Sequence, residues 1–303
     1  MKASAIQSLV FLFASFCSTN SHAQPTQKID TTPTETTTSE QTTSVLDRRI
    51  AIERETRFKP FVLTPHKPNY MMPYTYNSKP NQAPFAAIPD DNLDNEEIKF
   101  QFSVKFPVIE QLFDESGTLY FAYTNLSFWQ AYNSSSSSPF RETNHEPEVF
   151  LTVLNDWELF GFKNRINMIG LVHQSNGRNG TLSRSWNRLY ADFIFERGNF
   201  YFSIKPWLRL GDVGTDDNPD IEDFLGHGEF RIAYATGKHT TAIMLRNNFN
   251  SDNKGAFEFN YSYPMSRRAK WFVQFFEGYG ESLIDYNART KRIGIGIALT
   301  DWL

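Results

Sequence analysis

The sequence is poor in cysteine. Its only cysteine, Cys17, lies in the apolar N-terminal stretch AIQSLVFLFASFC. Lys2 precedes this stretch, and the tripeptide SHA, which ends at Ala23, fits the small-x-small pattern of a signal peptidase site. We therefore predict a secretory signal peptide over residues 1–23. A mature chain that begins after Ala23 contains no cysteine, which excludes disulfides, thiolate metal sites and a cysteine nucleophile.

Long hydrophobic runs and an excess of basic residues are missing as well. After residue 23 no apolar run reaches the roughly 18 residues of a transmembrane helix. The formal net charge is -4, and no basic cluster marks a nucleic-acid surface, so no nucleic-acid partner is expected. An exported chain with these properties is periplasmic, secreted, or a β-barrel of an outer membrane.

The first part of the predicted mature chain does not look like a packed domain. Residues 24–45 are rich in Thr, Gln and Pro, a composition that cannot bury a core and predicts disorder. Residues 46–95 carry many Pro, Asn and Tyr and are expected to form an irregular segment. The sequence therefore predicts an N-terminal extension over residues 24–95 and a folded domain over residues 96–303.

From Glu96 onward, apolar and polar residues alternate. In RIGIGIALT the isoleucines alternate with glycine and alanine, and in AFEFNYSY the aromatic residues alternate with Glu, Asn and Ser. This period of two predicts β-strands. We count roughly 11 or 12 segments of about ten residues, with aromatics near their ends, which is the pattern of a transmembrane barrel.

The predicted fold class is therefore all-β, a 12-stranded antiparallel transmembrane β-barrel of the outer membrane. Closure is required in lipid, where an open edge would leave backbone groups unpaired, and single-chain bacterial barrels have an even number of strands. The alternative is a soluble β-sandwich. Charge on the second face of several strands, at Lys205, Arg209 and Glu258, argues against it, because a narrow barrel can pair such charges in its lumen.

One polar stretch, HQSNGRNGTLSRSWN, interrupts the apolar pattern at residues 173–187. By alternation, His173 and Ser175 share a face with Leu171, and Asn187 shares a face with Leu189 on the next strand. All three polar side chains are thus predicted to face lipid, where they need hydrogen-bond partners. In a Ser–His–Asn row the imidazole can act as general base and the amide can hold its tautomer. A lipid-facing nucleophile indicates hydrolysis of lipid acyl esters; the alternative is an ordinary polar turn.

Several longer motifs resemble the outer membrane phospholipase A family. They are HQSNGR with SRSWNRLY, and also KPW (205–207), TDDNPDI (215–221), SSPFRETNHEP (137–147) and GYGESLIDYN (278–287). The resemblance covers about residues 96–303. It implies a calcium-dependent outer-membrane phospholipase A1/A2 that hydrolyses sn-1 and sn-2 acyl esters of phospholipids and lysophospholipids. It also implies activation by calcium- and substrate-dependent formation of a homodimer.

The same resemblance implies roles for individual residues. Ser175 matches the nucleophile, His173 the general base and Asn187 the residue that orients the histidine. The Gly177 amide matches the oxyanion hole. Three positions match the Ca²⁺ ligands: the Arg178 carbonyl, the Ser183 hydroxyl and, from the partner subunit, the Ser137 carbonyl.

The chain departs from the family pattern at three positions. Gly180 stands where some members have an acidic residue near calcium, Asn125 where a Gln is typical of the dimer interface, and Leu303 where the chain typically ends in Phe. His145 and His227 are expected to have no catalytic role. The acidic stretch 214–223 lacks the ligand spacing of an EF-hand and is predicted to be a solvated turn.

Two functions of other kinds stay open on the sequence. One is a non-enzymatic narrow barrel, either a channel or a structural protein, whose polar rim only resembles a site. The other is a barrel protease, although no acidic residues typical of such a site are evident at a rim.

Overall fold

A computed structural model describes residues 44–56, 64–86, 92–113, 116–211 and 216–302. The predicted signal peptide and most of the predicted disordered segment lie outside these residues. Fourteen antiparallel strands form one sheet, and twelve of them close into a ring. The ring strands are β2 (Asn69–Asn77), β3 (Glu96–Leu112), β4 (Gly117–Trp129), β5 (Phe140–Leu154), β7 (Phe162–Ser175), β8 (Ser185–Arg197), β9 (Phe200–Leu210), β10 (Gly228–Thr236), β11 (His239–Asn247), β12 (Gly255–Pro264), β13 (Lys270–Gly278) and β14 (Thr290–Thr300). The predicted 12-stranded antiparallel barrel is confirmed.

The short elements lie outside this ring. They are the two-residue strands β1 (Thr64–Pro65) and β6 (Glu158–Leu159), the helices α2 (Val45–Thr56) and α3 (Ile221–Leu225), and the 3-10 turns η1 (Ala83–Phe85) and η2 (Gly180–Leu182). Among the residues that the structure describes, no helix is long and apolar enough to cross a bilayer.

The predicted domain boundary at Glu96 is too late. The strand β2 precedes it and pairs with both β14 and β3, so this strand closes the barrel. Its alternation is hard to see in the sequence because Pro73 lies within it and the register shifts between Met72 and Thr75. The helix α2 (Val45–Thr56) begins at the last residue of the predicted disordered segment and otherwise lies in the segment 46–95, which was expected to be irregular.

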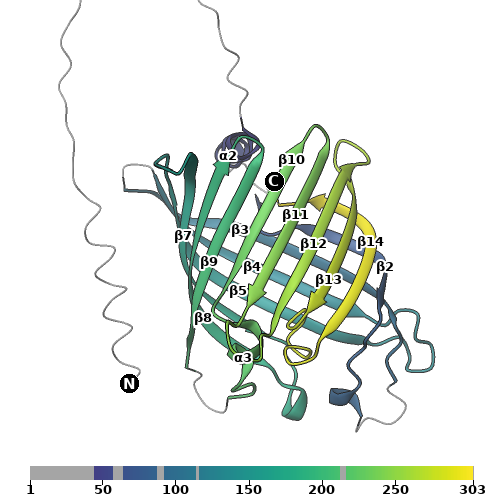
Figure 1. Cartoon of the computed structure of the whole chain (residues 1–303). Helices are drawn as coiled ribbons and strands as arrows, with labels where there is room; N and C mark the ends of the chain where they lie inside the picture. Colours follow the sequence, from purple (N-terminus) through teal and green to yellow (C-terminus); the bar gives the residue numbers. More distant parts are fainter. Residues whose placement is uncertain (1–43, 57–63, 87–91, 114–115, 212–215, 303) are drawn as a thin grey trace, which may run out of the picture. The chain divides into compact units, whose positions relative to one another are not determined.

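The helix α2 sits against one end of the barrel (Figure 1). Its first turn is capped by Ser44, whose Oγ accepts a hydrogen bond from the Asp47 amide at 3.0 Å. Leu46 is buried among barrel side chains, and the Arg49 guanidinium donates to the Trp302 carbonyl at 3.0 Å. The helix is therefore tied to the same barrel end as the C-terminal strand.

The barrel exposes apolar side chains and buries charged ones, the reverse of a water-soluble protein. Ile293, Ile295 and Leu299 on β14 are 54%, 52% and 66% exposed. Inside, the Arg141 guanidinium lies 2.6 Å from both Glu97 and Asp285, and the Arg292 guanidinium lies 2.7 Å from Glu97. Buried charges are tolerated only when they are paired in this way. Lys205 and Glu258, two of the charges that the sequence placed on the inner face, line the lumenal cavity. Arg209, the third, pairs instead with Asp216 in the loop that follows β9.

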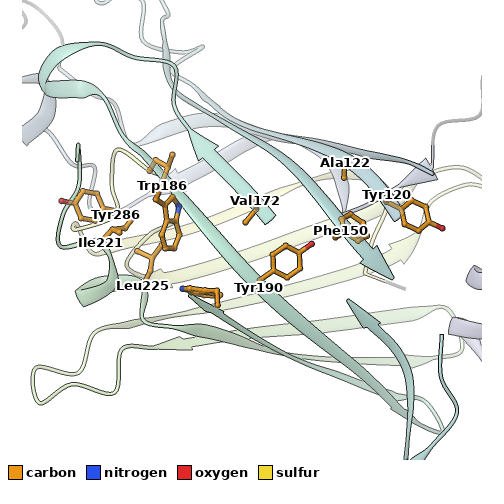
Figure 2. Close-up of a cluster of buried hydrophobic side chains, with 11 residues drawn as sticks. Tyr120, Ala122, Phe150, Val172, Trp186, Tyr190, Ile221, Leu225 and Tyr286 are labelled. Carbon is orange, nitrogen blue, oxygen red and sulfur yellow. The ribbon is translucent and has the colours of Figure 1, made fainter. Parts of the chain in front are cut away.

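A cluster of buried side chains, many of them aromatic, packs inside the barrel (Figure 2). Trp186 on β8 is fully buried, and its ring meets that of Trp207 edge to face at a centroid distance of 6.2 Å. Figure 2 shows Trp186 close to Ile221 and Leu225 of the α3 region. This packing anchors the start of β8, and with it the loop that precedes β8, to the barrel interior.

Loops of very different length join the strands at the two ends of the barrel. The end near α2 has tight connections, such as 198–199 and 237–238. The opposite end, where Figure 1 shows α3, carries longer segments between strands, which are 130–139, 176–184, 216–227 and 279–289. The polar stretch at residues 173–187 belongs to this long-loop end.

Candidate functional site

His173 and Asn187 meet on the outer surface of the barrel. They are Cα partners in the β7–β8 register, and His173 Nδ1 lies 2.9 Å from Asn187 Oδ1. His173 is exposed, as is Leu171 on the same face at 54%, whereas Val172 points into the lumen and is buried. The outward direction of His173 thus agrees with the alternation of the sequence.

The hydrogen bond also determines which imidazole nitrogen is available. An amide oxygen only accepts hydrogen bonds, so the bond to Asn187 places the ring proton of neutral His173 on Nδ1. The lone pair is then on Nε2, the form that a general base needs. Ser175 follows two residues later on the same face of β7 and pairs with Ser185 of β8. Its hydroxyl makes no hydrogen bond within the part of the chain that the structure describes.

The loop 176–184 is organised around Asn176, a residue that the sequence interpretation did not single out. Asn176 Oδ1 accepts hydrogen bonds from the amides of Arg178 and Arg184 at 3.3 and 3.0 Å. Its Nδ2 donates to the Leu182 carbonyl at 2.9 Å. The side chain is 5% exposed, so these bonds are shielded from water. Asn176 therefore holds the loop closed on itself directly after Ser175.

Gly177 follows Asn176 in the left-handed backbone region, with φ of 63°. A residue with a side chain adopts this conformation at a cost, whereas glycine does not. The neighbouring amides of Asn176 and Arg178 are both hydrogen-bonded within the loop. The Gly177 amide makes no hydrogen bond among the described residues, so a donor is available two residues after Ser175.

Buried polar side chains inside this end of the barrel hydrogen-bond to the loop 176–184 and hold it in place. Glu142, which is fully buried, accepts hydrogen bonds from Asn144 Nδ2 at 2.6 Å and from Asn176 Nδ2 at 3.3 Å. The amide of Ile284, in the loop 279–289, also donates to Glu142 at 3.1 Å. Glu142 and Asn144 lie in SSPFRETNHEP and Ile284 in GYGESLIDYN, two of the motifs that carried the resemblance. These two motifs thus meet at the Glu142 carboxylate, which also holds Asn176 of the loop 176–184.

Two of the three predicted calcium ligands, Arg178 and Ser183, lie in this same loop. Ser183 directly follows η2, and its Oγ donates to Asp217 Oδ2 at 2.6 Å. The Arg178 guanidinium is turned toward β5, where it donates to the Phe140 carbonyl at 3.2 Å. Among the described residues, the carbonyl of Arg178 accepts no hydrogen bond. Ser137 lies in a different loop, 130–139, with φ of 61°, and makes no hydrogen bond to Arg178 or Ser183 in the described chain.

The prediction of a solvated turn over residues 214–223 is wrong for residues 216–223, the part that the structure describes. Asp217 lies in this part. Its carboxylate faces Ser183, and the next residue, Asn218, is fully buried and accepts a hydrogen bond from the Ser185 amide at 3.0 Å. Burial and the neighbouring Asp220 carboxylate raise the pKa of Tyr286 to about 12, so its hydroxyl stays protonated and donates to Asp220 at 2.6 Å. Residues 216–220 therefore pack against the loop 176–184 and the start of β8.

The oxygen ligands available at this loop are of the kinds that bind calcium. Calcium takes oxygen ligands from carboxylates, carbonyls and hydroxyls, and Ser183, Asp217 and the Arg178 carbonyl supply all three kinds. Among the described residues, no cluster of three or more His, Cys, Asp or Glu could hold a metal. A cation here would thus bind mainly to neutral oxygens and one carboxylate. Gly180, where an acidic residue is absent, has φ of 62° and no atom within 4 Å of the position of a Cβ.

Comparison with known proteins places the chain among lipid-hydrolysing enzymes. Residues 46–299 match the family model described as phospholipase A1. The phospholipase A1 of Escherichia coli K12 is 40% identical over 243 residues, which cover 80% of this chain and 83% of that protein.

Two solved structures are similar over most of their length. One is an outer membrane phospholipase A of Escherichia coli that carries an asparagine-to-alanine mutation in its active site. Its TM-score is 0.80 at 38% identity, covering 84% of this chain and 98% of that one. The other is the outer membrane phospholipase dimer of Salmonella typhi with bound calcium. Its TM-score is 0.77 at 39% identity, covering 80% of this chain and 94% of that one.

Proposed function

The chain belongs to the phospholipase A1 family of outer-membrane enzymes, and we propose that it hydrolyses sn-1 and sn-2 acyl esters of phospholipids and lysophospholipids with Ser175, His173 and Asn187. The observation that carries this assignment is the 2.9 Å contact between His173 Nδ1 and Asn187 Oδ1 on the outer surface of the barrel. A base on this surface meets acyl lipids without their leaving the membrane. The active-site asparagine of the Escherichia coli enzyme supports the same role for Asn187.

In the proposed reaction, Ser175 Oγ attacks the ester carbonyl carbon while His173 Nε2 takes the hydroxyl proton. The carbonyl π electrons move onto oxygen, and the Gly177 amide donates a hydrogen bond to this oxyanion. Collapse of the intermediate breaks the bond to the glycerol oxygen, which leaves as an alcohol with the proton from His173. Water, deprotonated by His173, then attacks the carbonyl carbon of the acyl-serine. The bond to Ser175 Oγ breaks, His173 returns the proton to Oγ, and the fatty acid leaves.

We propose that calcium is the cofactor and that Ser183 Oγ, the Arg178 carbonyl and Asp217 hold it. Ser137 of the partner subunit would add its carbonyl, as the resemblance implies. When bound, calcium supplies positive charge close to the oxygen that becomes negative. The calcium-bound dimer of the Salmonella typhi relative supports this assignment. Asp217 provides a carboxylate in a site where Gly180 provides none.

We also propose that the active form is a calcium- and substrate-dependent homodimer formed through the outer face around the site. Polar side chains gather there: Ser127 Oγ lies 3.1 Å from Thr143 Oγ1 and donates to Asn125 Oδ1 at 3.0 Å. Asn125 Nδ2 donates no hydrogen bond among the described residues and can reach a second copy. Polar side chains that face lipid gain most when a partner satisfies them.

The decisive experiment measures fatty-acid release from phospholipid micelles by the refolded protein, with calcium or with EDTA. We expect release that requires calcium and is abolished in Ser175→Ala. Ser185→Ala is the matched control, because Ser185 is the cross-strand neighbour of Ser175 and should tolerate the change. Release by Ser175→Ala at the wild-type rate would refute the proposed nucleophile. No release by the wild type under any calcium condition would favour a non-enzymatic barrel.

A further inference from the structure

A second histidine lies beside Ser175 on the outer surface. His145 of β5 is the Cα partner of Ser175 of β7. Val149, four residues further along β5, is 43% exposed, so His145 shares the outward face. Side chains that are directly opposite in an antiparallel pair have Cβ atoms about 5 Å apart. Ser175 therefore has His173 along its own strand and His145 across the strand pair.

The imidazole of His145 is oriented by Tyr123. His145 Nδ1 lies 2.6 Å from the Tyr123 hydroxyl, and the two rings stack with an interplanar angle of 28°. The opposite edge of the ring points to Gly177: a Cβ at that glycine would lie 3.8 Å from His145 Cδ2 and 3.9 Å from Nε2. The edge that carries Nε2 thus lies beside the residue whose amide is proposed to bind the oxyanion.

The proposal uses the tautomer in which the Tyr123 hydroxyl donates to His145 Nδ1. A tyrosine hydroxyl that donates to Nδ1 leaves the proton of the neutral imidazole on Nε2. Among the described residues, Nε2 of His145 has no hydrogen-bond partner. A polar N–H on a lipid-facing surface is costly unless something accepts its hydrogen bond. The Tyr123 bond satisfies only one of the two nitrogens, so the other is available for a ligand.

We propose that His145 is a further catalytic residue, which donates a hydrogen bond from Nε2 to the substrate oxygen that becomes negative beside Gly177, and that Tyr123 positions it. This rests on the proposed phospholipase reaction at Ser175. His145 transfers no proton: His173 takes the serine proton and returns it to the leaving alcohol, while His145 only stabilises the charge. The sequence alone predicted no catalytic role for His145, because its register with Ser175 is a property of the folded sheet.

The test compares kcat and KM of refolded full-length variants on a p-nitrophenyl acyl ester in micelles at saturating calcium. His145→Phe keeps a ring but removes the donor, and we expect kcat to fall about 10²-fold with little change in KM. His145→Gln restores an N–H donor and should recover part of that loss. The matched control is His239→Phe, because His239 forms the same kind of pair with Tyr261, at 2.7 Å, elsewhere on the barrel.

The outcomes distinguish failure of the His145 proposal from failure of the proposed phospholipase reaction at Ser175. Wild-type kcat in His145→Phe, together with an inactive Ser175→Ala, would overturn this inference and leave the proposed function intact. A raised KM at unchanged kcat would also overturn it, because that pattern marks ground-state binding. An active Ser175→Ala would instead refute the proposed function. If His145→Phe does not refold, Tyr123→Phe decides: we expect kcat to fall about tenfold, and an unchanged kcat would contradict the proposal.

Discussion

Asn187 Oδ1 accepts a hydrogen bond from His173 Nδ1 at 2.9 Å across the β7–β8 pair, on the face of the barrel that carries Leu171. The bond holds the imidazole in the tautomer whose Nε2 can accept a proton. It does so without a carboxylate, whose charge would be costly beside lipid.

Replacing Asn187 by alanine should therefore lower kcat at least about tenfold, the effect of losing one neutral hydrogen bond. The fold should persist, because the side chain lies on the barrel surface. Asn187→Asp keeps an acceptor oxygen and should retain more activity than the alanine variant. The measurement is kcat for fatty-acid release from micelles. Equal kcat for Asn187→Ala and the wild type would contradict the orienting role.

Asp217→Asn should shift the calcium titration of activity to higher concentration by about tenfold or more, because the site loses its carboxylate charge. Asp223→Asn is the matched control: Asp223 belongs to α3 and makes no contact with Ser183 in the described chain. Activity at saturating calcium should recover in both variants. An unchanged midpoint in Asp217→Asn would remove this residue from the proposed site.

Gly180→Asp should move the same titration in the opposite direction. The position of a Cβ at Gly180 is open, with no atom within 4 Å, and Asp tolerates its positive φ better than most residues. An added carboxylate near Ser183 should tighten calcium binding. Gly180→Asn has nearly the same shape without the charge and separates the two effects. If the Asp and Asn variants titrate alike, charge at this position does not tune the metal.

Glu97→Gln should destabilise the barrel by about 3–5 kcal/mol, because it leaves buried guanidinium groups of Arg141 and Arg292 without their shared carboxylate. Denaturant unfolding in micelles measures the change. Glu277→Gln is the control, since its bond to Arg289 is largely exposed and should contribute about 1 kcal/mol or less. Similar decreases in the free energy of unfolding of the two variants would show that the buried ion pairs of Glu97 stabilise the barrel no more than an exposed pair does.

Ile295→Arg should destabilise the barrel in a bilayer by about 2–4 kcal/mol, the cost of a cation on the lipid face near the midplane. Ile295 is 52% exposed on β14, on the outer face. Phe249→Arg offers the comparison, because Phe249 is 91% exposed but lies in the loop 248–254. If both substitutions have equally small effects, the outer face of β14 is not in contact with lipid.

Much of the fold follows from the sequence because the pattern that produces it is local. Alternation along β14 places isoleucines outward and small residues inward without reference to any other strand. The strand β2 escaped the same interpretation, because Pro73 and a register shift break its alternation. Its identity as a barrel strand depends on pairing with β14, which is distant in sequence.

Some features of the candidate site also follow from local sequence, and others depend on the tertiary structure. Outward placement of His173 and Ser175 and the short separation from Asn187 are consequences of alternation and of one hairpin, so the sequence by itself determined them. Asp217 beside Ser183, and His145 beside Ser175 and Gly177, required the closed barrel. Those contacts join strands and loops through register and loop packing, and alternation along a single strand carries no information about either.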